Sequence, residues 1–285
     1  MTATTLTERT VTIGGRQIFY AEAGTGPAVL LLHGGGPGAS GLSNYSRNID
    51  ALSENFRVIV PDLPGYGRST KGVDGNDPFG HLAHGIRGLM NELGIDTAHL
   101  VGNSYGGACA LRLALDTPDR VEKMVLMGPG GIGTTRALPT AGLRHLLAYY
   151  GGEGPSRDKL RTFIRQYLVY DGASVPGEII DSRYESSIDP DVVANPPLRR
   201  PSGLFALRTL WRMDFTRDRR LAYLETPTLV VWGAADKVNP PSGGRMLAEI
   251  MPNCDLLVAA NAGHWRRRYC CQPQQRTAER RQRIE

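Results

Sequence analysis

The most informative motif of the chain is Gly102-Asn103-Ser104-Tyr105-Gly106. It matches the pattern Gly-x-Ser-x-Gly, which places a serine on a sharp turn between a strand and a helix, where small neighbours let the two elements pass close together. An apolar run at 98–101 precedes the motif and a helical pattern at 105–115 follows it, so the context fits such a turn. Ser104 is therefore a candidate nucleophile, although the motif alone is also compatible with a tight structural turn.

Outward from this turn, the chain alternates apolar runs with helical patterns, which predicts an α/β fold with right-handed crossovers. Continuous apolar runs suit parallel strands that are covered on both faces, and they lie at 28–32, 56–60, 98–101, 123–127, 228–232 and 255–259. Strands then stop between 127 and 228, where helical patterns occupy 142–150, 159–170, 177–187 and 204–214. We expect a helical lid at 133–220, inserted into a core formed by 1–132 and 221–285.

Two further residues could complete a catalytic triad with Ser104. Asp236 follows the predicted strand 228–232, and His264 follows the predicted strand 255–259. A serine hydroxyl needs a base to take its proton, and the base needs an acid that fixes its tautomer and stabilises the imidazolium. The order Ser, Asp, His, with each residue after a strand, is that of the α/β-hydrolase fold. Singly, Asp236 could cap a turn and His264 could be a surface histidine; together the three predict a triad.

The run His33-Gly34-Gly35-Gly36 follows the predicted strand 28–32 and is a candidate oxyanion hole. Glycines let the backbone approach a substrate closely and direct N–H groups at it. The second donor should be the N–H of Tyr105, because it is the residue after the nucleophile. A plain glycine-rich turn is the alternative.

The positive charge of the chain is confined to one end. The 285 residues carry a formal net charge of +5, and residues 266–285 alone hold seven arginines and two glutamates. Residues 1–265 are therefore neutral overall and lack the patterned basic face of a nucleic-acid-binding protein.

Composition narrows the class of protein further. A chain with 41% apolar and 21% charged residues is neither disordered nor fibrous. No apolar run approaches the roughly 18 residues of a membrane span, and the first residues do not form a secretory signal. The four cysteines do not amount to a disulfide framework. We expect a cytoplasmic protein with no membrane or nucleic-acid partner, and no motif requires a metal or an organic cofactor.

Taken together, the motifs resemble those of the meta-cleavage product hydrolases, which are serine-type carbon–carbon bond hydrolases of aromatic-ring degradation. The likeness runs from about residue 10 to Trp265. The motifs that carry it are His33-Gly34-Gly35-Gly36-Pro37-Gly38, Ser43-Asn44-Tyr45-Ser46-Arg47-Asn48, Leu100-Val101-Gly102-Asn103-Ser104, Leu126-Met127-Gly128-Pro129-Gly130-Gly131, Trp232-Gly233 and Gly263-His264-Trp265.

The resemblance implies an α/β-hydrolase fold with a mostly parallel eight-stranded sheet and an inserted helical lid. It implies a 2-hydroxy-6-oxohexa-2,4-dienoate substrate whose C5–C6 bond is hydrolysed, and it suggests a homo-oligomer. Ser104 would be the nucleophile, His264 the base and Asp236 its orienting acid, with the N–H groups of Gly35 and Tyr105 as the oxyanion hole. The residues that it implies for substrate binding are Gly34, Gly36, Asn44, Asn103, Arg183 and Trp265.

Three questions stay open at this stage. A carboxylesterase would share the triad and the oxyanion hole, and a catalytically silent binding protein could keep the pocket. Apolar lid residues could line a roomy pocket for the substituent on C6, or could serve plain core packing; they are Leu143, Leu146, Leu147, Phe163, Leu207, Leu210 and Trp211. Residues 266–285 lack the apolar helix face that the family carries after Trp265, so we interpret them as an altered ending of the kind that a frameshift produces. The alternative is a genuine basic tail that contacts RNA or a membrane.

Overall fold

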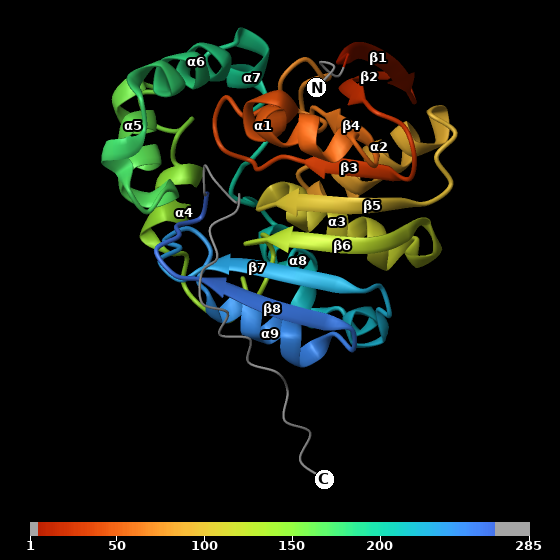
Figure 1. Ribbon diagram of the computed structural model, residues 1–285. Coiled ribbons are helices and arrows are strands. Elements are labelled where there is room, and N and C mark those ends of the chain that lie inside the picture. Colours follow the sequence, from red (N-terminus) through yellow and green to blue (C-terminus); the bar gives the residue numbers. More distant parts are fainter. Residues whose placement is uncertain (1–4, 266–285) are drawn as a thin grey trace.

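An eight-stranded sheet forms the centre of the computed structural model, which describes residues 5–265 (Figure 1). The strand order is β1-β2-β4-β3-β5-β6-β7-β8, with β1, β2 and β4 paired antiparallel and the remaining neighbours parallel. This confirms the predicted α/β class and the mostly parallel eight-stranded sheet. The strands are β1 (Thr7–Ile13), β2 (Arg16–Ala23), β3 (Ala28–Leu32), β4 (Arg57–Pro61), β5 (Ala98–Asn103), β6 (Val121–Met127), β7 (Thr228–Gly233) and β8 (Cys254–Ala259).

Helices cover both faces of this sheet. Successive side chains along a strand point to opposite faces, so a continuous apolar run needs a packing partner on each face. In β3, Leu30 and Leu32 pack into the large core with α2 (Pro78–Glu92), α3 (Tyr105–Asp116) and α9 (Ser242–Ile250), whereas Val29 and Leu31 pack on the other face with α1 (Gly41–Ser53). The pattern of continuous apolar runs in the sequence thus corresponds to strands buried from both sides.

The chain between β6 and β7 contains helices and no strand. It carries α4 (Ala141–Leu147), α5 (Arg157–Thr162), α6 (Gly177–Ser187), α7 (Pro190–Ala194) and α8 (Ala206–Arg212). Figure 1 shows α4 beside the ends at which the parallel strands β5 to β8 finish, and α5 to α7 continue from it at the same side of the molecule toward α1. None of the helices among residues 5–265 is long and apolar enough to cross a membrane.

The hairpin β1–β2 was missed by the individual strand predictions. Its strands meet at a turn through Gly14 and Gly15, both of which have positive φ angles. β1 lies at the edge of the sheet and alternates polar and apolar residues, so it lacks a continuous apolar run, whereas β2 does contain one at 18–21 that the strand predictions overlooked. The alternation over 7–13 and the Gly-Gly pair were the signals that could have revealed them.

The prediction of one helix over 159–170 was also wrong in detail. The α-helical turns end at Thr162, and Phe163–Leu168 forms a π-helical turn. Such wider turns are rare and are frequent at functional sites.

Candidate active site

Ser104 lies on the sharp turn between β5 and α3, with a φ angle of 51°. Positive φ is strained for a residue other than glycine, and a strained turn of this kind holds the side chain at the end of the sheet. The flanking glycines are required by close approach: a Cβ atom on Gly102 would lie 2.5 Å from the Gly106 carbonyl oxygen, and one on Gly106 would collide with the Leu32 carbonyl. The sequence motif therefore corresponds to the strained turn that it predicts.

His264 and Asp236 form a buried pair. Nδ1–H of His264 donates to Oδ2 of Asp236 at 2.7 Å, and both side chains are almost completely inaccessible to solvent. The other carboxylate oxygen of Asp236 accepts the backbone N–H groups of Val238 and Asn239 at 2.8 and 2.9 Å. This arrangement fixes the tautomer of His264 with Nε2 unprotonated, so that Nε2 is available as a base.

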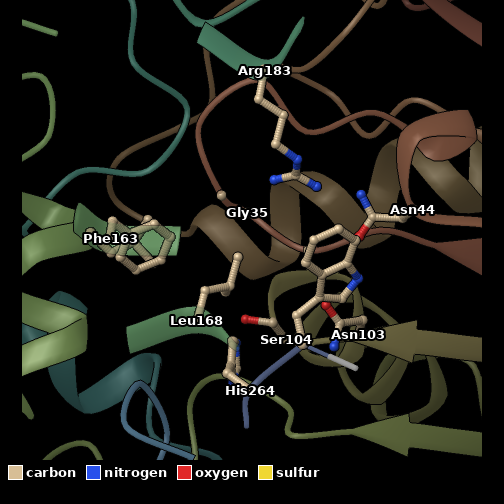
Figure 2. Close-up of a pocket in the computed structure, with 12 residues that line it drawn as sticks. Gly35, Asn44, Asn103, Ser104, Phe163, Leu168, Arg183 and His264 are labelled. Carbon is tan, nitrogen blue, oxygen red and sulfur yellow. The ribbon is translucent and has the colours of Figure 1, made fainter. Parts of the chain in front are cut away.

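Ser104 and His264 line the same pocket, and Figure 2 shows their side chains together at its floor. The hydrogen bonds among residues 5–265 do not include one between the two side chains, which is common when no substrate is bound. The structure thus brings together all three residues of the predicted triad, with Asp236 behind His264.

The glycine turn after β3 is held from behind by two buried side chains. Nδ1–H of His33 donates to the Gly34 carbonyl at 2.8 Å, while Nε2 accepts the N–H of Leu63 at 2.9 Å. The hydroxyl of Tyr66 donates to the Gly35 carbonyl at 3.1 Å. In a planar trans peptide the N–H of the next residue points opposite to the carbonyl, so the N–H groups of Gly35 and Gly36 point away from His33 and Tyr66.

Tyr105 lies directly against this turn. A Cβ atom on Gly35 would be 3.0 Å from the Cβ atom of Tyr105. Tyr105 is the first residue of α3, so its N–H has no partner within the helix. The structure therefore places the two residues of the predicted oxyanion hole next to each other.

Arg183 projects from α6 into the upper part of the pocket (Figure 2). It is 6% exposed, and none of the ion pairs among residues 5–265 involves it. Burial lowers its pKa to about 10, so the guanidinium stays charged at neutral pH. It lies 5.0 Å from the Trp265 ring, and a Cβ atom on Gly36 would be 3.2 Å from its Nη1 atom. A buried cation without a carboxylate partner is a ready site for an anionic substrate group.

Two asparagines complete the polar lining. Nδ2 of Asn44 donates to the Ser40 carbonyl at 3.1 Å, and Nδ2 of Asn103 donates to the Met127 carbonyl at 3.3 Å. A backbone carbonyl thus fixes the orientation of each side-chain amide. The predicted site residues that line the pocket are Gly34, Gly35, Gly36, Asn44, Asn103, Ser104, Arg183, His264 and Trp265.

Three apolar side chains complete the lining: Leu146, Phe163 and Leu168. The sequence had singled out Leu146 and Phe163 but had missed Leu168. Leu207 and Trp211 are not part of this lining, since they are 82% and 56% exposed. Helical spacing alone could not tell a pocket residue from a surface residue.

Hydrolases from other bacteria are similar in sequence to this chain over most of its length. A 2-hydroxy-6-oxo-6-phenylhexa-2,4-dienoate hydrolase of Comamonas testosteroni is 38% identical over 251 residues, which cover 87% of this chain and 85% of that protein. The chain belongs to the meta-cleavage product hydrolases. A 2-hydroxy-6-oxononadienedioate/2-hydroxy-6-oxononatrienedioate hydrolase of the same species is 36% identical with the same coverage. The general model of the alpha/beta hydrolase fold matches residues 27–152.

Solved structures agree with this membership. The meta-cleavage product hydrolase of Pseudomonas fluorescens IP01 superimposes with a TM-score of 0.79 at 32% identity, covering 90% of both chains. The 2-hydroxy-6-oxo-6-phenylhexa-2,4-dienoate hydrolase of Rhodococcus sp. strain RHA1 gives a TM-score of 0.77 at 32% identity, over 92% of this chain and 93% of that one. In this meta-cleavage product hydrolase, Ser104, His264 and Arg183 line one pocket, and Asp236 lies behind His264.

Proposed function

We propose that this chain hydrolyses the C5–C6 bond of 2-hydroxy-6-oxohexa-2,4-dienoates formed in the degradation of aromatic compounds. The observation that carries the proposal is the placement of Arg183, a buried cation without an ion-pair partner among the described residues, in the same pocket as Ser104 and His264. A simple ester needs a nucleophile and an oxyanion hole, whereas a dienoate also needs a cation for its carboxylate.

In the proposed reaction, Arg183 binds the C1 carboxylate while Asn44 and Asn103 contact the polar end of the dienoate. The dienol first becomes a ketone, which makes C5 a leaving group once C6 is attacked. Ser104 attacks the C6 carbonyl as His264 takes its proton, and the N–H groups of Gly35 and Tyr105 stabilise the oxyanion. When the C5–C6 bond breaks, its electron pair passes through the C3–C4 double bond to the C2 oxygen, which takes the proton held by His264, so that 2-hydroxypentadienoate leaves. Water, deprotonated by His264, then attacks the acyl group on Ser104 and releases the carboxylic acid and the serine hydroxyl.

Residues 133–220 form a lid over this site in our proposal. Arg183, Leu146, Phe163 and Leu168 come from this segment, so it supplies both the cation and the apolar lining. A closed lid would exclude water from the pocket, and this exclusion would strengthen the interaction between Arg183 and the carboxylate.

We also propose that the enzyme acts in the cytoplasm as a homo-oligomer. Native mass spectrometry of the full chain measures the number of subunits directly, and a single-subunit mass would contradict the second part of this proposal.

The function is tested by comparing two substrate classes on one protein sample. We expect kcat/KM for a 2-hydroxy-6-oxodienoate to exceed that for a short-chain p-nitrophenyl ester by at least about 100-fold. Ester hydrolysis without dienoate cleavage would instead support a carboxylesterase. A protein that binds the dienoate but does not react with a fluorophosphonate at Ser104 would be a silent binding protein.

A further inference from the structure

The pocket has two chemically different ends. Figure 2 shows Arg183 and Asn44 on one side of it and Phe163 and Leu168 on another, with Ser104 at the floor. The first group is cationic and polar, and the second is apolar. A substrate that spans the pocket past Ser104 therefore meets a different environment at each end.

The apolar end depends on the π-helical turn at Phe163–Leu168. The turn brings its first and last residues, Phe163 and Leu168, into the same pocket. Leu146 from α4 joins them, and all three belong to one buried apolar cluster. Each is at most 8% exposed, so this end of the pocket is part of a packed core and not an open surface.

The basic side chains of α4 and the π-helical turn have partners outside the pocket. His145 stacks on Tyr167 with ring centroids 4.5 Å apart, Nη1 of Arg144 donates to the Pro139 carbonyl at 2.7 Å, and Nη2 of Arg165 donates to the Val175 carbonyl at 3.1 Å. On the neighbouring loop after β7, Nζ of Lys237 donates to the Gln166 carbonyl at 3.0 Å. Among the described residues that line the pocket, Arg183 is the one permanent cation.

We infer that the group on C6 of the natural substrate is uncharged and apolar, an alkyl or aryl group, and not a chain that ends in a second carboxylate. The inference rests on the proposed function, in which Arg183 binds the C1 carboxylate and the C6 carbonyl lies at Ser104. The C6 substituent then extends toward Leu146, Phe163 and Leu168. A second carboxylate there would be buried without a partner, which is costly, whereas an apolar group gains from burial.

The level of sequence identity does not distinguish an apolar C6 group from one that ends in a carboxylate. Of the two relatives from Comamonas testosteroni, one is named for a 6-phenyl substrate and the other for a dienedioate. The nature of the lining decides it, since these two substrate types differ in charge at the far end.

The test measures kcat/KM of the full chain for 2-hydroxy-6-oxo-6-phenylhexa-2,4-dienoate and for 2-hydroxy-6-oxononadienedioate in the same buffer. We expect the phenyl substrate to be preferred by at least about 100-fold. Equal reactivity, or a preference for the dienedioate, would overturn the inference and leave the proposed function standing. If the folded protein cleaves neither dienoate, the proposed function fails and the inference fails with it.

A pair of variants at one position gives an independent measure. Leu146→Lys places a cation at the apolar end, and Leu146→Met keeps it apolar at similar size. We expect Leu146→Lys to shift the ratio of kcat/KM values toward the dienedioate by at least about 10-fold, and Leu146→Met to leave the ratio close to that of the parent. An unchanged ratio in Leu146→Lys, with near-native circular dichroism, would place the C6 substituent elsewhere. If Leu146→Lys does not fold, the ratio for the parent protein still decides the question.

Discussion

The carbonyl of Leu168 accepts the backbone N–H of Trp265 at 2.8 Å, which ties the π-helical turn to the loop that carries His264. Gly263 packs on the same segment, because a Cβ atom there would lie 2.7 Å from the Tyr170 nitrogen and 3.0 Å from the Leu168 carbonyl oxygen. The loop of the proposed catalytic base and the apolar end of the pocket are therefore joined by direct backbone contacts.

The loop that carries Asp236 is attached to the proposed lid as well. The N–H of Gly142 donates to the Lys237 carbonyl at 3.1 Å, and the hydroxyl of Thr140 donates to the Val238 carbonyl at 2.7 Å. The first part of the proposed lid thus supports the loops that carry Asp236 and His264, so its displacement should lower kcat.

Gly263→Ala tests this coupling. The added methyl group meets backbone atoms of 168–170, so either the π-helical turn or the His264 loop must move. We expect kcat to fall by about 10-fold or more, equivalent to at least about 1.4 kcal/mol, with a smaller change in KM. Gly75→Ala is the matched control, because a Cβ atom there meets nothing within 4 Å. Equal kcat values for the two variants would show that the contact does not position His264.

Arg183→Gln should weaken dienoate binding selectively. Removing the guanidinium leaves the C1 carboxylate without a cation, so we expect kcat/KM for a dienoate to fall by about 100-fold, mainly through KM. Hydrolysis of a neutral p-nitrophenyl ester, if detectable, should change little. Arg161→Gln serves as a control, since Arg161 lies on the same segment and pairs at the surface with Asp158. Parallel losses for both substrate types would indicate a structural role for Arg183.

Asp214 should be important for stability because it joins the two ends of the proposed lid. Its carboxylate accepts N–H groups of Gly133, Thr135 and Thr216 at 3.0, 2.8 and 3.1 Å, and it also accepts both threonine hydroxyls. Burial raises its pKa, but the hydrogen bonds from these threonines outweigh burial and hold the pKa below its usual value.

Asp214→Asn turns an amide N–H₂ group toward some of these donors. We expect the free energy of unfolding to fall by about 1 to 3 kcal/mol, measured by urea denaturation. Asp255→Asn, at an exposed position on β8, should change it by less than about 0.5 kcal/mol. A loss no larger at Asp214 than at Asp255 would rule out this anchoring role.

His33 should make folding sensitive to mild acid. Burial lowers the pKa of this histidine below its ordinary value of 6.5, an effect only partly offset by Asp62. Because the folded state binds the proton less readily than the unfolded state, the stabilisation is complete above about pH 6.5 and is lost as pH falls toward the folded pKa. In that window we expect a slope of up to about 1.4 kcal/mol per pH unit from this group.

The measurement is the free energy of unfolding between pH 8 and pH 5 for the parent and for His33→Gln. The variant should show a shallower decline, since its side chain does not titrate. Identical slopes would mean that His33 does not contribute to the pH dependence.

Much of the site could be predicted because its chemistry restricts residue types. Ser104 needs glycine neighbours for its strained turn, and Asp236 and His264 each follow a buried strand, so sequence order and strand pattern locate them. Arg183 was named as a possible carboxylate ligand on a predicted lid helix and through the family resemblance, but an arginine on such a helix usually faces solvent, so its burial could not be predicted. Leu168 could not be predicted, because its position depends on a π-helical turn that helical periodicity does not encode. The exposure of Trp211 was likewise invisible, since apolar spacing does not tell which face of a helix finds a partner.

The decisive experiment identifies the products that the parent protein and Ser104→Ala form from 2-hydroxy-6-oxo-6-phenylhexa-2,4-dienoate. We expect benzoate and 2-hydroxypenta-2,4-dienoate in equal amounts from the parent, and binding without product formation by Ser104→Ala. A folded parent protein that leaves the dienoate intact, or a Ser104→Ala variant that cleaves it at the parental rate, would show that this chain is not a carbon–carbon bond hydrolase that depends on Ser104.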